Sequence, residues 1–126
     1  AEVKKLFQND LEGTIAKYAI IQNAKLYREK IAIAVVDHTV GRIVAAQAAD
    51  ELLNIIGIDT SFVLFPDQEG RVILSARSMG DVNVQVVLEK LGGGGNAAAA
   101  GGQISGKSLS QVATELSHAI DQYLEG

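Results

Sequence analysis

Glycine is concentrated in one short segment of the chain, residues 92–102. This segment reads Gly-Gly-Gly-Gly-Asn-Ala-Ala-Ala-Ala-Gly-Gly and holds six of the 13 glycines. Glycine permits close backbone approach and leaves N–H groups unshielded, so a glycine run can line an anion-binding concavity. We therefore expect residues 92–95 and the Asn96 amide to bind phosphate, with a helical turn at residues 97–100 directing further N–H groups at it. The alternative is a flexible linker.

A second candidate for anion binding is the segment Ser75-Ala76-Arg77-Ser78. Arg77 falls at the end of an expected strand, just before a glycine-containing turn into a helix, and such strand ends are common ligand sites in α/β proteins. A guanidinium can hold a phosphate through two parallel hydrogen bonds. The alternative is a surface arginine paired with a carboxylate such as Asp81. Because the helix that starts near Asp81 leads into the glycine run, we expect both segments to form one site.

The other polar residues that could bind metal or take part in catalysis lack the partner residues that such sites need. Asp37 and His38 are adjacent, and neighbouring residues of a strand point in opposite directions, so we expect an exposed His38 and no metal site. Residues 106–108 (Gly-Lys-Ser) match the tail of a P-loop without its glycine spacing. The charges of Asp50 and Glu51 are expected to be solvated on a helix face. We predict no catalytic residue and no metal ligand in this chain.

The composition restricts the class of protein. The chain has 126 residues, of which 48% are hydrophobic, enough for one domain with its own core. A net charge of −4 disfavours a dedicated duplex DNA or RNA binder and still allows a small anionic ligand. The absence of cysteine excludes disulfides and suits a reducing compartment such as the cytoplasm. No apolar run approaches the roughly 20 residues that span a bilayer, so we expect no membrane contact by this chain.

Hydrophobic periodicity predicts the elements that hold the two candidate segments. Strands are expected at residues 23–28, 31–37, 61–65, 71–76 and 102–104, the second of them apolar on both faces. Helices are expected in part of residues 3–21, with a break near Gly13, and at residues 42–56. A third helix is expected from a cap at Asp81 to Leu91. The last is expected to begin at a capping box formed by Ser108 and Gln111, with Leu116, Ile120 and Leu124 facing inward. The sum is an α/β fold: a mixed sheet of about five strands packed with about four helices in a single compact domain.

Several of these segments together resemble a known family. Residues 73–78 (Ile-Leu-Ser-Ala-Arg-Ser), residues 83–91 and the glycines at 92–95 are similar to the C-terminal, substrate-binding domain of DHH-type phosphoesterases. Within that superfamily they are most similar to bacterial cyclic-di-AMP phosphodiesterases. Residues 45–53 and 61–64 fit the same pattern, so the resemblance covers nearly the whole chain. It implies that residues 1–126 form a DHH-associated substrate-binding domain cut from a longer protein, and a start without methionine agrees with an excised piece.

The resemblance also implies which residues bind substrate. Arg77 matches the family's phosphate-contacting arginine, and three glycines match those of its Gly-Gly-Gly-His motif. Asn96 stands where the family usually has histidine, and an amide can donate a hydrogen bond but cannot carry a proton or a positive charge. The expected substrate-binding set is Arg77, Ser78, Gly93, Gly94, Gly95 and Asn96.

The function implied is nucleotide and phosphate recognition for a manganese-dependent phosphodiesterase that hydrolyses cyclic-di-AMP or short oligonucleotides. An N-terminal DHH domain of the same parent would hold paired Mn²⁺ ions, and this chain would bind no cofactor and turn over nothing alone. The parent is expected in the cytoplasm, either free or anchored to a membrane, and a homodimer is compatible with the sequence. Two alternatives stay open: a nucleic-acid-binding module related to the C-terminal domain of alanyl-tRNA synthetase, and an oligomerisation domain whose glycines permit tight packing.

Overall fold

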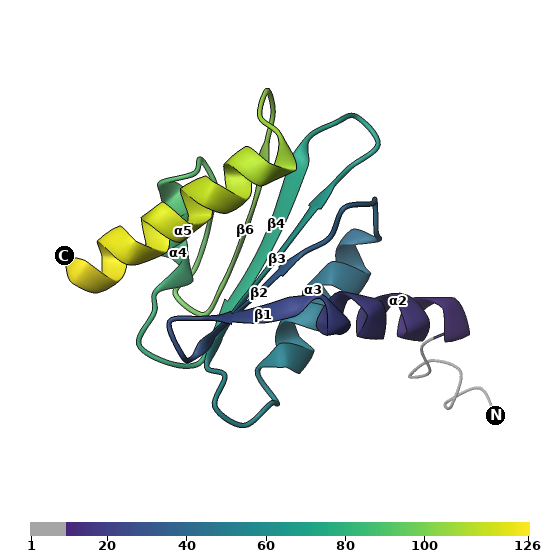
Figure 1. Cartoon of the computed structure of the whole chain (residues 1–126), viewed down its shortest axis with the longest axis horizontal. Coiled ribbons are helices and arrows are strands. Elements are labelled where there is room, and N and C mark those ends of the chain that lie inside the picture. Colours follow the sequence, from purple (N-terminus) through teal and green to yellow (C-terminus); the bar gives the residue numbers. More distant parts are fainter. Residues whose placement is uncertain (1–9) are drawn as a thin grey trace.

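Six strands form one sheet that carries helices on both faces (Figure 1). The computed structural model describes residues 10–126. The helices are α2 (Leu11–Gln22), α3 (Arg42–Leu52), α4 (Val84–Glu89) and α5 (Leu109–Glu125). The strands are β1 (Ala24–Tyr27), β2 (Ile31–Val35), β3 (Thr60–Pro66), β4 (Val72–Ser78), β5 (Gly94–Gly95) and β6 (Ala99–Ile104). The predicted α/β class is confirmed, with one strand more than expected.

The strands are ordered β1-β2-β3-β4-β6-β5 across the sheet. Strands β2 and β3 are parallel and are joined through α3, whereas the other neighbouring pairs are antiparallel. The sheet is therefore mixed, as predicted. The additional strand is β5, which lies inside the glycine run and pairs with β6 at the edge. Glycine has low strand propensity, so a two-residue glycine strand gives no signal in the sequence.

One hydrophobic core lies between the sheet and the α2–α3 layer. Its members are fully or nearly buried and come from both helices, from β2, β3 and β4, and from the segments that follow β2 and α3: Ile20, Ala32, Ala34, Val36, Ala45, Ala48, Ala49, Leu52, Ile58, Val63, Phe65 and Ile73. The small alanines of α3 let this helix pack closely on β3 and β4. As a result, one face of α3 is fixed directly against the sheet.

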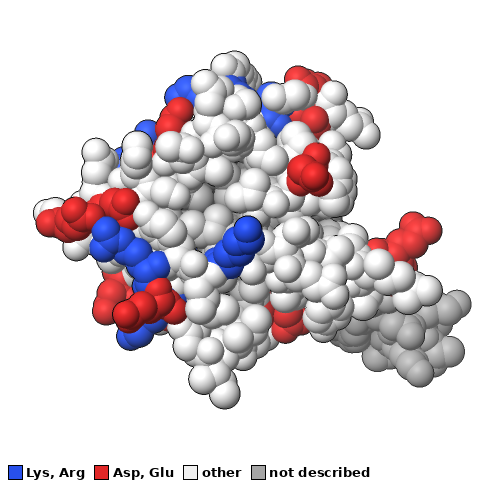
Figure 2. Space-filling view, viewed as in Figure 1, with Lys and Arg blue, Asp and Glu red and all other residues white. Residues whose placement is uncertain are grey.

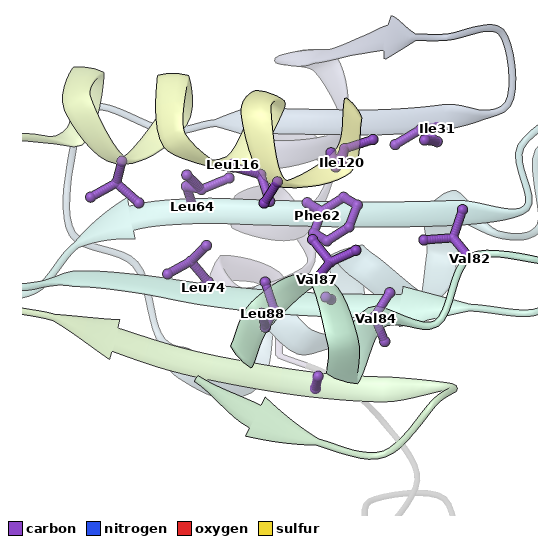
Figure 3. Close-up of a cluster of buried hydrophobic side chains, with 14 of the residues drawn as sticks. Ile31, Phe62, Leu64, Leu74, Val82, Val84, Val87, Leu88, Leu116 and Ile120 are labelled. Carbon is purple, nitrogen blue, oxygen red and sulfur yellow. The ribbon is translucent and has the colours of Figure 1, made fainter. Parts of the chain in front are cut away.

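A second core lies between the sheet and the α4–α5 layer, which is in front of the sheet in Figure 1. Figure 3 shows Leu116 and Ile120 of α5 and Val87 and Leu88 of α4 pointing toward Phe62 and neighbouring strand residues. The capping box at Ser108 and Gln111 that starts α5 is present, as predicted. The predicted inward position of Leu124 was wrong. This residue is 42% exposed, because it lies in the last turn of α5.

Several element boundaries differ from the predictions. No break occurs at Gly13, since α2 is continuous from Leu11 and the Asp10 carboxylate caps it by accepting a hydrogen bond from the Gly13 N–H. The part of this prediction at residues 3–9 lies outside the described residues. Helix α3 ends four residues earlier than expected, and Ile56 is fully exposed beyond it. The side chain that caps α4 belongs to Asn83, not to Asp81, because Asn83 accepts from the N–H of Val86.

Charged side chains are interspersed on the α4–α5 side of the molecule. Figure 2 shows acidic and basic groups side by side near the margins of this view, with a mostly uncharged centre and no large basic patch. This distribution agrees with the acidic composition and gives this face no footprint for a nucleic-acid backbone. Among residues 10–126, no helix is both long and apolar enough to cross a membrane.

Candidate functional site

The alternation of side chains along β4 determines which face of the sheet Arg77 occupies. Leu74 and Ala76 belong to the core beneath α4 and α5, whereas Ile73 belongs to the core beneath α3. Successive side chains of a strand point to opposite faces, so Ser75 and Arg77 lie on the α3 side. Arg77 is one residue from the end of β4, as the sequence predicted.

The Arg77 guanidinium is held by two contacts and is otherwise free. Its Nε donates to Oδ1 of Asp50 on α3 at 2.9 Å, and its Nη1 donates to the carbonyl oxygen of Ala76 at 2.8 Å. Arginine has five N–H groups. The other three make no hydrogen bond to any described residue, and the side chain is 22% exposed. The guanidinium is thus oriented and can still donate two parallel hydrogen bonds to an anion.

Asp50 was expected only as a solvated charge on a helix face, and Asp81 was named as an example of a carboxylate partner in the alternative that Arg77 is a paired surface arginine. The pairing with a carboxylate is present, but the partner is Asp50, because the crossover through α3 places Asp50 against β4. The buried Ser61 hydroxyl fixes this placement by donating to the carbonyl oxygen of Ala49 at 2.6 Å. Ser61 is also the β3 residue paired with Arg77. The last turn of α3 and the Arg77 backbone are therefore held to the same residue.

The glycine run lies on the same face of the sheet as Arg77, separated from β4 by β6. Gly94 of β5 is paired with Gly101 of β6, and Gly101 is paired with Ser75 of β4. Directly paired residues share a face, so this row of three lies on the α3 side with Arg77. A Cβ at Gly94 would meet no atom within 4 Å. The space above Gly94 is open, and a ligand on this face can reach its backbone.

Gly93 and Gly95 serve the hairpin itself. A Cβ at Gly93 would lie 2.6 Å from the carbonyl oxygen of Gly101. Gly95 has a φ of +149°, and a Cβ there would lie 2.5 Å from Cα of Ala100. Both positions require glycine for packing against β6 or for backbone conformation. The three glycines of the predicted site therefore differ in role, and Gly94 is the one that faces the open side.

Asn96 closes the turn between β5 and β6. Its Oδ1 accepts from the N–H groups of Ala98 and Ala99, both at 2.9 Å, and its own N–H donates to the carbonyl oxygen of Ala99 at 2.8 Å. The predicted helical turn at residues 97–100 was wrong, because the Asn96 side chain forms an Asx-type turn and β6 begins at Ala99. The Nδ2 group makes no hydrogen bond to the described residues and is free to donate to a ligand.

Arg77 and Asn96 are connected through one residue of β6. Ala99 is the partner of Arg77 in the β4–β6 pairing, and Ala99 also exchanges hydrogen bonds with Asn96. One strand therefore separates the two polar groups at this end of the sheet, and its side chain there is only a methyl group. The structure therefore places Arg77, Gly94 and Asn96 on one face of the sheet, with β6 between Arg77 and the other two residues.

Ser78 does not share the face of Arg77. It is 7% exposed, and its hydroxyl lies 3.4 Å from the Thr60 hydroxyl and accepts from the N–H of Gly80 at 3.3 Å. These contacts hold the turn that follows β4. Ser78 belongs to the other side of the sheet, where it lines a separate pocket with Asn83 and Tyr123.

The acidic and histidine side chains of the described residues do not form a metal centre. Asp37 and His38 point toward one another, contrary to expectation, with Oδ1 and Nδ1 3.1 Å apart, because the chain bends after β2. Both are exposed, and no third ligand joins them. Within residues 10–126 there is no group of three or more His, Cys, Asp or Glu side chains that could hold a metal ion.

The comparisons with known proteins identify the family. The model of the DHHA1 domain matches residues 28–126, and the chain belongs to this family. The chain is 39% identical over 128 residues to the cyclic-di-AMP phosphodiesterase GdpP of Bacillus subtilis and 34% identical over 126 residues to the cyclic-di-AMP phosphodiesterase PdeA of Listeria monocytogenes. Each match covers 98% of this chain and 19% of the relative, so the chain spans about a fifth of the length of these proteins. The predicted resemblance is confirmed.

Two solved structures share the fold. An exopolyphosphatase-related protein of Bacteroides fragilis matches with a TM-score of 0.81 at 19% identity, covering 95% of this chain and 37% of that one. A phosphodiesterase of Vibrio cholerae described as pGpG-specific matches with a TM-score of 0.59 at 19% identity, covering 88% of this chain and 39% of that one. At these identities the likeness concerns the fold, and it confirms the predicted α/β architecture.

Proposed function

We propose that this domain recognises the phosphate of a cyclic dinucleotide or short oligonucleotide for a DHH-family phosphodiesterase. The observation that carries this proposal is the Arg77 guanidinium, which is oriented by Asp50 and has three unused N–H groups. The open backbone of Gly94 lies on the same face of the sheet, two strands away from β4. Charge-assisted, bidentate hydrogen bonds are the strongest contacts that a side chain offers a phosphate. Asn96 adds one amide donor at the same end of the sheet.

The names of the relatives support the choice of substrate class. GdpP and PdeA are cyclic-di-AMP phosphodiesterases, and the Vibrio protein is described as acting on pGpG. The substrate in each of the three names is a dinucleotide whose nucleosides are joined through phosphate. The site presents one oriented guanidinium and exposed glycine backbone, without an extended basic surface. These features suit a dinucleotide better than a long nucleic-acid backbone.

Bond cleavage is assigned to another part of the polypeptide. Two-metal hydrolysis needs a set of carboxylate and histidine ligands, and the described residues provide no such set. We infer that a DHH domain in the same protein binds the metal ions, Mn²⁺ by the family resemblance, and that the present domain positions the substrate against it. Incubating the 126-residue chain with Mn²⁺ and cyclic-di-AMP should release no linear product, and hydrolysis would contradict this division of roles.

Calorimetric titration of the chain with cyclic-di-AMP, linear di-adenylate and a short oligoribonucleotide tests the binding role. Arg77→Ala should weaken binding of the dinucleotides about tenfold or more, because it removes a charge-assisted contact. Lys107→Ala is the matched control, since it also removes one positive charge but lies on the opposite layer, paired with Glu115. Equal losses in both variants would indicate unspecific attraction, and steeply salt-dependent binding of RNA alone would favour the synthetase-type module.

A further inference from the structure

A cavity of about 310 Å³ lies on the α3 side of the sheet, next to the candidate site. Ser75 and Gly101 line it, and they belong to the same row as Gly94. Gln103 and Arg42 also line it. Ser75 precedes Arg77 by two residues on one face of β4, about 7 Å at the rise of an extended strand. The cavity is therefore a continuation of the surface that carries Arg77.

Helix α3 forms one wall along the whole length of this surface. Arg42 and Asp50 are eight residues apart and share a helix face, a separation of about 12 Å along the axis. On β4, the distance from Ile73, the partner of Gln103, to Arg77 is about 13 Å. The two lengths agree, and contacts join the elements at both ends: Asp50 to Arg77 at 2.9 Å and Arg42 to Gln103 at 3.3 Å.

Several of the residues on the groove surface between the two arginines have small side chains. Ala46 shares the helix face of Arg42 and Asp50, at the midpoint of the wall. Ala99 and Gly101 face the same side from β6, because the alternate residue, Ala100, belongs to the opposite core. The result is a groove with a guanidinium at each end, where Asp50 contacts Arg77 and Asp67 lies near Arg42. Phe65 and Ile73 add apolar lining to the cavity within it.

The Arg42 guanidinium is weakly engaged. Its side chain is 56% exposed, its hydrogen bond to Oε1 of Gln103 is long at 3.3 Å, and Oδ2 of Asp67 is 3.8 Å away. Asp67 is held instead by Arg71, whose Nε lies 2.7 Å from Oδ2. Burial would raise the pKa of Asp67, but hydrogen bonds from the side chain and backbone of Arg71 and from the backbone of Glu69 outweigh it, so the pKa lies below its usual value. The negative charge of Asp67 is thus already satisfied by partners other than Arg42.

We propose that Arg42 forms a second phosphate subsite, which binds the other phosphate of a dinucleotide whose first phosphate is held by Arg77. The Ser75 hydroxyl, which makes no hydrogen bond to the described residues, lies between the two ends of the groove and offers a polar contact to the intervening nucleoside. Gln103 offers a second polar group beside Arg42. The groove therefore selects ligands with two phosphates over ligands with one. This inference rests on the proposed function, since it requires the Arg77 site to bind phosphate.

The test compares ligands that differ only in phosphate number. The 126-residue chain is titrated calorimetrically with 5′-phosphorylated di-adenylate, which has two phosphates, and with unphosphorylated di-adenylate, which has one. Arg42→Ala should weaken binding of the first ligand about tenfold and change binding of the second less than about twofold. Arg42→Lys, which keeps the charge but loses the planar fork, should give an intermediate loss. Lys107→Ala is the charge-matched control, and circular dichroism checks the fold of each variant.

The outcomes separate this inference from the proposed function. If Arg77→Ala weakens both ligands and Arg42→Ala weakens neither, or both equally, the second subsite is refuted and the Arg77 site stands. If Arg77→Ala has no effect on either ligand, or the unaltered chain binds neither, the proposed function fails and the subsite fails with it. If Arg42→Ala weakens binding of the two-phosphate ligand alone, the result supports both the second subsite and the proposed function.

Discussion

The carboxylate of Asp50 lies 2.9 Å from Nε of Arg77 and joins the last turn of α3 to β4. The contact uses the single N–H of Nε and leaves both N–H groups of Nη2 unused. Asp50 is 63% exposed, so the pair has little value for stability. Its consequence is orientation, because a guanidinium that is fixed before ligand arrives loses less conformational entropy on binding.

Substitutions at Asp50 separate this orientation from charge. Asp50→Asn keeps an oxygen that can accept from Nε and removes a negative charge near the bound phosphate, so affinity for cyclic-di-AMP should be unchanged or rise up to about threefold. Asp50→Ala removes the acceptor and should weaken binding by about threefold or more, since Arg77 must then be ordered on binding. Calorimetric titration of both variants checks this. A parallel change in both would mean that only the charge matters.

The glycines should respond differently to alanine according to their surroundings. Gly95→Ala requires a conformation that is nearly restricted to glycine and a contact 2.5 Å from Cα of Ala100, so it should lower the free energy of unfolding by about 2 kcal/mol or more. Gly94→Ala has space for its methyl group and should leave stability within about 0.5 kcal/mol. The same variant should weaken dinucleotide binding, because its methyl group occupies the ligand face. Urea unfolding and titration give the two readouts, and normal binding by Gly94→Ala would remove Gly94 from the site.

Asn96 has two functions that different substitutions can separate. Asp in place of Asn keeps the Oδ1 acceptor for the N–H groups of Ala98 and Ala99 and replaces the amide donor by a negative charge. Asn96→Asp should therefore keep the melting temperature and weaken dinucleotide binding at pH 7. Asn96→Ala should lower both, with a loss of stability of about 1 kcal/mol for the two hydrogen bonds. Thermal unfolding with titration checks the pair, and unaltered affinity in Asn96→Asp would restrict this residue to the turn.

Much of this fold and part of this site could be predicted from the sequence. The two segments that carry Arg77 and the glycine run were both located, since local composition marks a strand end and a glycine loop. The Asx-type turn at Asn96 also had a usable signal, because asparagine commonly bonds the backbone two residues on. That signal was overridden by the helix propensity of the four alanines that follow.

The remaining features depend on pairing between distant segments. Whether Gly93, Gly94 or Gly95 faces the ligand side is decided by the register of β5 on β6, which a run of identical residues cannot specify. Asp50 and Arg77 are 27 residues apart in the sequence, and the crossover through α3 brings them into contact. Charge spacing along α3 alone gave no reason to separate Asp50 from other surface carboxylates.

Asp121 of α5 provides a stability prediction that is independent of ligand. Its Oδ1 accepts from the Tyr27 hydroxyl at 2.7 Å and from Nε of Arg28 at 2.9 Å, linking α5 to β1. The Tyr27 hydrogen bond and the Arg28 charge hold the pKa of Asp121 below its ordinary value of 3.8, against the effect of burial. A carboxylate with a lowered pKa in the folded state stabilises the fold above pH 3.8, and this contribution disappears as the pH falls through the folded-state pKa.

Asp121→Asn should therefore lower the urea midpoint at pH 7, and the difference from the unaltered chain should shrink progressively below pH 3.8. Glu115→Gln removes a carboxylate from the same helix, but its partner Lys107 is 45% exposed, so its effect at pH 7 should be smaller. Urea unfolding of the three proteins at pH 7, 4 and 3 measures both differences. If Asp121→Asn lowered the midpoint equally at all three values, the ionised form of Asp121 would not be the source of the stabilisation, and the contacts to Tyr27 and Arg28 would act through packing alone.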